Sequence, residues 1–223
     1  MRVLGVDGCV GGWIVVELTD DRVSGCRFAA SFAEIASDAA TVIGVDIPLG
    51  HPMSGPRRAD AAAKLALGAR RNSVFHAPTP TALEQPTHAG ASAAQRSATG
   101  LGLSMQAWRL GPKILEATPA WAADPERVRE VHPEVSFQTL AGGSPLPGKK
   151  TWAGHRARCE LLRAAGIVVP DDPGEAGVRG SPDDVCDAAA VAWTAARIAR
   201  GEALSLPEPP EHDADGHPVA IWY

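Results

Sequence analysis

Short apolar runs open the chain and predict the strands of a sheet. Residues 2–7, 13–18 and 23–29 each carry such a run, and only a few residues separate one run from the next. Connections this short predict antiparallel hairpins, because a parallel crossover needs about a dozen residues or more. A fourth run, at 41–46, is apolar on both faces, as a buried central strand requires.

A short helix is expected between the third and fourth runs. Ser31 and Glu34 have the spacing of a capping box, which predicts a helix that begins after Ser31 and continues to about Ala40. With this helix as the crossover, the fourth strand can lie parallel to the first.

The middle of the chain, about residues 50–124, is rich in Ala, Gly and Pro and predicts a helical insertion. Its apolar spacing favours helices at 57–67, 89–98 and 104–123. The prolines in 70–80 exclude regular helix near them, so a loop is expected there.

The remaining pattern predicts one more strand of the main sheet and a long C-terminal helix. A fifth strand is expected at 127–132, and helices at 153–165 and 183–200 with a linker at 170–180 between them. Gly201 suits the left-handed position that follows a helix. The apolar end, 219–223, predicts a terminal strand.

The predicted order of elements indicates an α/β fold with a mixed five-stranded sheet flanked by helices. The first three strands are antiparallel, the fourth is parallel to the first, and the insertion follows the fourth. This is the order of the ribonuclease-H-like fold, although the pattern alone leaves other α/β sheets open. We expect a single domain over residues 1–223 with the insertion at about 50–124.

Composition narrows the class of protein. Apolar residues make up 45% of the 223 residues, yet no uninterrupted apolar run is long enough to cross a bilayer or to form a secretory signal. We therefore expect a cytoplasmic protein. The four cysteines are scattered without a Cys-x-x-Cys pair, which favours reduced thiols over a zinc knuckle or a disulfide framework. The net charge of −5 excludes bulk electrostatic coating of nucleic acid but leaves room for a nuclease with a local basic patch.

Four aspartates are the strongest candidates for chemistry. Asp7 and Asp46 each end an apolar run, where a parallel strand presents its side chains at the carboxyl edge of the sheet. Asp184 and Asp187 are three residues apart near the start of the last helix, so both can point at one cleft. Clustered carboxylates repel one another unless a cation lies among them, and their hard oxygens suit Mg²⁺ or Mn²⁺.

Several motifs in fixed order closely resemble those of a family catalogued as domain of unknown function 429, whose members are regarded as predicted ribonuclease-H-like nucleases. The resemblance covers nearly the whole chain. The motifs are Gly5-Val6-Asp7-Gly8-Cys9-Val10-Gly11-Gly12-Trp13, Asp46-Ile47-Pro48-Leu49-Gly50, Arg71-Asn72-Ser73-Val74-Phe75, Val131-His132-Pro133-Glu134-Val135-Ser136-Phe137, Lys149-Lys150-Thr151 and Asp183-Asp184-Val185-Cys186-Asp187-Ala188.

The resemblance implies a metal-dependent nuclease with carboxylate ligands. Asp7 is similar to the first-strand carboxylate of the superfamily, Asp46 to the acid that ends its fourth strand, and Asp184 with Asp187 to the acidic pair on its last helix. Glu134, assigned to the fifth strand, suits a metal ligand or an orienting carboxylate. In a two-metal hydrolysis Asp7 would bridge the ions, Asp46 would hold one, and Asp184 or Asp187 the other.

Purely structural roles stay open for several of these residues. Asp184 lies three residues after Ser181, so it also fits a helix cap. Arg71, Lys149 and Lys150 are candidates for binding the phosphates of a nucleic-acid substrate, yet exposed charged loops have the same composition.

Two other functions also stay open. The first is a non-catalytic binding module with a ribonuclease-H-like fold. The second takes the glycine-bearing turn at 8–12 as a phosphate cradle, as in actin-like proteins and sugar kinases, although those have a second duplicated domain for which this chain lacks the length. The sequence leaves open whether the substrate is DNA or RNA, and it leaves the oligomeric state open as well.

Overall fold

The computed structural model describes all residues, 1–223, and divides them into two compact units. The first unit comprises Met1–Asp46, Glu126–Leu204 and Trp222–Tyr223, and the second comprises Ile47–Pro125 and Ser205–Ile221. The second unit thus contains the predicted insertion together with a hairpin from near the end of the chain.

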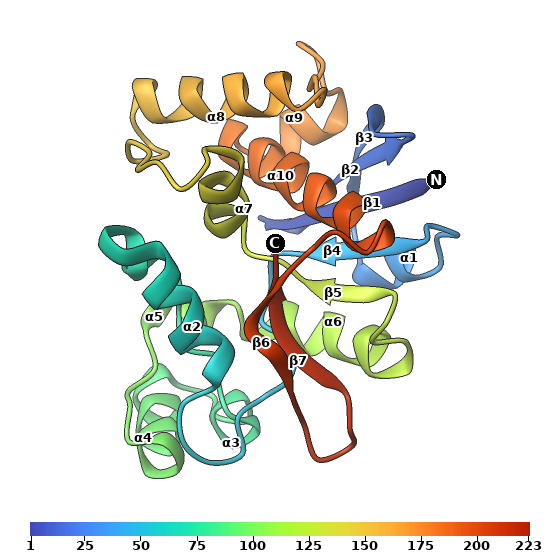
Figure 1. Ribbon diagram of the computed structural model, residues 1–223. Coiled ribbons are helices and arrows are strands. Elements are labelled where there is room, and N and C mark those ends of the chain that lie inside the picture. Colours follow the sequence, from blue (N-terminus) through green and yellow to red (C-terminus); the bar gives the residue numbers. More distant parts are fainter. The chain divides into compact units, whose positions relative to one another are not determined.

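A five-stranded mixed sheet forms the centre of the first unit (Figure 1). Its strand order is β3-β2-β1-β4-β5, with β1, β2 and β3 antiparallel and β4 and β5 parallel to β1. The strands are β1 (Arg2–Cys9), β2 (Gly12–Thr19), β3 (Arg22–Ala29), β4 (Val42–Val45) and β5 (Val128–Glu130). The predicted sheet, its directions and its flanking helices are therefore confirmed.

Helices flank this sheet on both faces. They are α1 (Phe32–Ala36), α7 (Pro133–Leu140), α8 (Trp152–Ala164), α9 (Glu175–Arg179) and α10 (Pro182–Ala199). Trp13 of β2 packs edge-on against Phe32 of α1, with the ring centroids 5.1 Å apart. The opposite face, which carries Ile14 and Val16, joins the core that is built with α10. Side chains alternate between the faces of a strand, so β2 contributes to both layers.

The long helix α10 lies close against the sheet because small residues meet at the contact. A Cβ atom added to Gly5 of β1 would lie 2.1 Å from the backbone nitrogen of Ala192, and one added to Gly44 of β4 would lie 2.9 Å from Val191. Gly5 and Gly44 are register partners in the parallel pair. This approach fixes where the first turns of α10 lie relative to the strand ends.

The second unit is mainly helical. Its elements are α2 (Arg58–Leu67), the 3₁₀ helix η1 (Gly68–Ser73), α3 (Pro80–Leu83), α4 (His88–Thr99), α5 (Met105–Arg109), α6 (Gly111–Ala123), and the hairpin of β6 (Ser205–His212) and β7 (Pro218–Trp222). A small cluster of buried apolar residues holds α3, α4 and α5 together, and α2 packs against β6.

Several sequence-based boundaries were wrong. The predicted helix at 104–123 is two helices, because Pro112 lacks an N–H and a new helix starts at Gly111, with Leu110 as its cap. Part of the predicted loop at 70–80 belongs to η1, and the linker at 170–180 contains α9. The fifth strand is shorter than 127–132.

Candidate functional site

Asp7 and Asp46 lie side by side at the ends of two parallel strands. Val6 and Val45 are register partners, and the backbone N–H of Asp46 donates to the carbonyl oxygen of Val6 at 2.9 Å. Gly5 and Gly44 face α10, and side chains alternate along a strand, so Asp7 and Asp46 point to that same face. The strands therefore bring both predicted carboxylates together beneath the first turns of α10.

Asp184 and Asp187 come from those first turns. Ser181 caps α10: its hydroxyl accepts from the N–H of Asp184, and its own N–H donates to a carboxylate oxygen of Asp184 at 2.8 Å. Asp184 thus has the capping role that the sequence left open, and its charge also acts on Asp7. Asp187 is deeper in the helix and is buried, with 2% of its surface exposed.

Lys149 supplies the positive charge of this cluster. Its ammonium donates to Oδ2 of Asp187 at 2.5 Å, while Oδ1 of Asp187 is buried without a hydrogen-bond partner. A buried carboxylate oxygen without a partner is costly unless a ligand satisfies it. One oxygen of Asp187 is therefore engaged by the lysine and the other is available.

Burial, and after it the charges of neighbouring acids, raise the pKa values of three of these aspartates. The pKa of Asp7 is well above its usual range, first because of burial and then because of the charges of Asp46, Asp187 and Asp184. Burial raises the pKa of Asp46 to about 7 and that of Asp187 to about 6, in both cases against the opposing effect of Lys149. Burial lowers the pKa of Lys149, but the acids around its ammonium raise it by more. A divalent cation would relieve the same repulsion.

The prediction that Glu134 lies on the fifth strand was wrong. It lies in the first turn of α7. Pro133 starts this helix, because its fixed φ and missing N–H suit a first helical position. The guanidinium of Arg158 holds both carboxylate oxygens of Glu134, at 2.8 and 2.9 Å, and both side chains are buried. Glu134 therefore links α7 to α8, and its charge acts on Asp46 and Asp187.

Arg158 also orders the segment that carries Lys149. Its guanidinium donates to the carbonyl oxygen of Pro147 at 3.0 Å, two residues before the lysine. In the sequence Arg158 is one of a series of arginines that suggests a basic surface patch, but the structure buries it against Glu134. The available signal was its spacing: Arg158 lies four residues from Gly154 and from Leu162, on the face of α8 that is buried.

The other two predicted phosphate-binding residues are both exposed. Lys150 follows Lys149 directly and is exposed. Arg71 lies in the second unit, on η1, and is exposed as well. Of the three basic candidates, the structure brings Lys149 to the carboxylates of the first unit.

The cluster fits a hard divalent cation through its chemistry. Asp7, Asp46 and Asp187 offer carboxylate oxygens, one of which lacks a partner, and their mutual repulsion favours added positive charge. These aspartates are not among the groups of three residues whose ligand atoms lie within 4.8 Å of one another. Those groups are His155, Cys159 and Cys186, and Asp213, Asp215 and His217. The aspartates would therefore move closer to share an ion, with Lys149 shifting away from Asp187.

The family model described as "Protein of unknown function (DUF429)" matches residues 5–212. The chain belongs to this family. No curated protein and no solved structure matches it. None of its helices combines the length and the apolar character that a membrane crossing requires.

Proposed function

We propose that this DUF429 chain is a metal-dependent nuclease with a ribonuclease-H-like fold. The order of its strands, with three antiparallel and two parallel, supports this fold, as does the position of the acids on β1, after β4 and on α10. The observation that carries the proposal is the buried Oδ1 of Asp187, which has no partner and lies in a cluster whose carboxylates hold raised pKa values.

Asp7, Asp46 and Asp187 would hold Mg²⁺ or Mn²⁺, with Asp184 as a further ligand once it leaves its cap. When bound, the metal supplies a polarised water and charge stabilisation at a phosphodiester. Asp7 is the central ligand, because it lies between β2 and β4 in the sheet and senses the charges of the other three aspartates.

Lys149 would bind a phosphate oxygen of the substrate. Its ammonium keeps its charge, since three carboxylates stabilise it, and its side chain is about one-third exposed. A lysine released from Asp187 by metal binding can therefore donate to an anionic group that approaches the acids.

The test is cleavage of a mixed panel of labelled single-stranded, double-stranded and branched DNA and RNA with Mn²⁺ or Mg²⁺. We expect metal-dependent cleavage that Asp7→Asn abolishes while circular dichroism shows the variant to be folded. Calorimetry with Mn²⁺ supplies the second readout, and Asp7→Asn should weaken Mn²⁺ binding as well.

A binding module is the second candidate, because the Lys149–Asp187 ion pair closes part of the cluster without any metal. In that case the wild-type protein would neither bind Mn²⁺ nor cleave any member of the panel. Either of these results in a folded wild-type protein would overturn the nuclease.

A further inference from the structure

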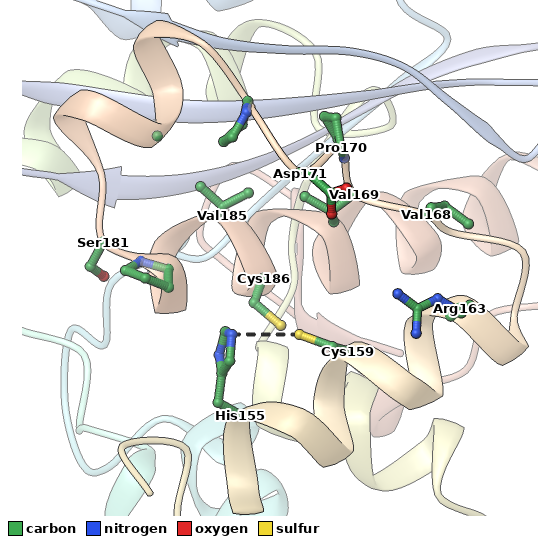
Figure 2. Close-up of a pocket in the computed structure, with 13 residues that line it drawn as sticks. His155, Cys159, Arg163, Val168, Val169, Pro170, Asp171, Ser181, Val185 and Cys186 are labelled. Atoms are coloured by element: carbon green, nitrogen blue, oxygen red, sulfur yellow. Dashed lines mark hydrogen bonds between the residues drawn. The ribbon is translucent and has the colours of Figure 1, made fainter. Parts of the chain in front are cut away.

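Three soft or borderline ligand groups meet between α8 and α10, in the first unit. His155 and Cys159 lie one turn apart on α8, and Cys186 faces them from α10 (Figure 2). The imidazole Nε2 of His155 lies 3.6 Å from the Cys159 sulfur, and the ligand atoms of all three residues lie within 4.8 Å of one another. Both thiols are free.

A carboxylate lies on the far side of the His155 imidazole from the sulfur. Its Nδ1 lies 3.9 Å from Oδ1 of Asp183, while its Nε2 faces the sulfur. Histidines that bind a metal through one ring nitrogen usually present the other to a carboxylate or carbonyl, which fixes the tautomer and raises the basicity of the ligand. The arrangement therefore has a ligand set, and Asp183 lies near enough to hydrogen-bond to His155 after a small shift.

The three residues also line a cavity. It has a volume of about 380 Å³, and its wall includes Arg163, Val168 and Pro170 (Figure 2). Sites in which three protein ligands face a cavity leave a fourth position for water or a small ligand. The cluster is thus neither fully covered by packing nor an exposed surface group.

We propose that His155, Cys159 and Cys186 form a site for Zn²⁺, with the fourth coordination position facing the cavity. Two thiolates and an imidazole are the ligands that Zn²⁺ takes in proteins, and they differ from the hard carboxylates of Asp7, Asp46 and Asp187. None of the zinc ligands is a ligand of the proposed nuclease site, although Cys186 and Asp187 are neighbours in α10.

Zinc binding at this site releases protons. The ion is bound by two thiolates and neutral imidazole, so the Cys159 and Cys186 thiols each transfer one proton to water or buffer as their sulfurs bind. A thiol without metal is mostly protonated near neutral pH, because its ordinary pKa is about 8.5. Affinity should therefore rise steeply with pH.

The experiment uses the full chain, purified under reducing conditions and freed of metal by a chelator. Co²⁺ is added first, because thiolate ligands give it an ultraviolet charge-transfer band and intense visible bands when the site is tetrahedral. Zn²⁺ is then titrated against the Co²⁺ form and against a chromophoric chelator. We expect one equivalent of Co²⁺ with thiolate bands and its displacement by one equivalent of Zn²⁺.

Variants at the cluster separate zinc binding from folding. Cys159→Ser and His155→Ala change half-buried side chains and should each weaken Zn²⁺ binding by more than about 100-fold, with Asp183→Asn costing about 10-fold as a positioning residue. Cys26→Ser, at a half-buried cysteine on β3, is the matched control and should bind like the wild type. Zn²⁺ should also slow alkylation of Cys159 but not of Cys26.

Other outcomes overturn the proposal. Wild-type protein without thiolate bands excludes the site, as do bands that survive in Cys159→Ser. A cluster that forms a Cys159–Cys186 disulfide but binds no ion when reduced also excludes it. Asp7→Asn should keep full Zn²⁺ affinity, so failure of the nuclease and failure of the zinc site are distinguishable.

Discussion

The ammonium nitrogen of Lys149 lies 2.5 Å from Oδ2 of Asp187, across 38 residues of sequence. This contact joins the glycine- and proline-rich segment before α8 to the first turns of α10. The same ammonium opposes the raised pKa values of Asp7 and Asp46. In the metal-free protein, Lys149 therefore supplies the positive charge of the cluster. An incoming divalent ion would compete with it for Asp187.

Replacing Lys149 by methionine should strengthen Mn²⁺ binding while it weakens cleavage. Removal of one positive charge a few ångströms from the ion is expected to raise Mn²⁺ affinity roughly tenfold. Cleavage should fall, because the proposed phosphate contact is lost.

Calorimetry with Mn²⁺ and initial rates of cleavage measure the two effects of Lys149→Met. Lys150→Met removes the same charge from the exposed neighbour and should leave Mn²⁺ affinity within about twofold, as expected of a screened surface charge. Weaker Mn²⁺ binding in Lys149→Met than in the wild type would contradict the competition between lysine and metal.

The metal-free protein should lose stability as the pH rises from about 4 to 7. In the folded state the pKa of Asp46 is raised from 3.8 to about 7 and that of Asp187 from 3.8 to about 6. The folded chain therefore keeps protons that the unfolded chain has released, and each further rise in pH favours unfolding. We expect a loss of several kcal/mol over this range, since each pKa unit corresponds to about 1.4 kcal/mol.

Urea unfolding at several pH values with a chelator present measures this loss. Asp46→Asn removes one of the titrating groups and should flatten the dependence. Saturating Mn²⁺ should flatten or reverse it, because the ion binds the ionised carboxylates of the folded state. A metal-free stability that rises steadily from pH 4 to 7 would show that these acids are not clustered.

The close approach of α10 to β1 should make Gly5 intolerant of any side chain. A Cβ there would lie 2.1 Å from one backbone atom of α10 and 2.2 Å from another, so the helix itself must shift. We expect Gly5→Ala to reduce the free energy of unfolding by more than about 3 kcal/mol, at the upper end of overpacking effects.

Gly25→Ala is the matched control for this contact. Gly25 lies on β3 of the same sheet, where a Cβ would meet its nearest neighbour at 3.7 Å, an ordinary contact distance. Its alanine variant should change the free energy of unfolding by less than about 1 kcal/mol. Equal effects at the two glycines in urea unfolding would refute a special contact at Gly5.

The sheet could be predicted from the sequence because its signals are local. Apolar runs joined by tight turns gave the three antiparallel strands, and the Ser31 cap and the Gly201 position are both confirmed, with a φ of 70° at Gly201. The middle of the chain was harder. Its alanine-rich segments have helical propensity almost throughout, so tertiary contacts and prolines decide where each helix ends.

The four aspartates could be placed by their strand and helix positions, whereas the partners of the acids could not. Nothing local to Lys149 indicates that it reaches Asp187, and nothing local to Glu134 indicates Arg158. The thiol cluster was missed for the same reason. His155 and Cys159 show helical spacing, but Cys186 comes from another helix, and only the packing of α8 on α10 brings it near.

Replacing one member of the buried ion pair of Glu134 and Arg158 should destabilise the fold far more than each residue's share of the loss when both are replaced together. Arg158→Met leaves a buried carboxylate without its bidentate partner, and Glu134→Gln leaves a buried guanidinium. Each change is expected to cost about 3–5 kcal/mol, whereas the double variant should cost less than the sum by several kcal/mol. Urea unfolding of the wild type, the two single variants and the double variant completes the double-mutant cycle.

Two outcomes would contradict this role of the pair. Costs that simply add would mean that the pair does not join α7 to α8. A Glu134→Gln protein that stays fully stable but no longer binds Mn²⁺ would make Glu134 a metal ligand instead.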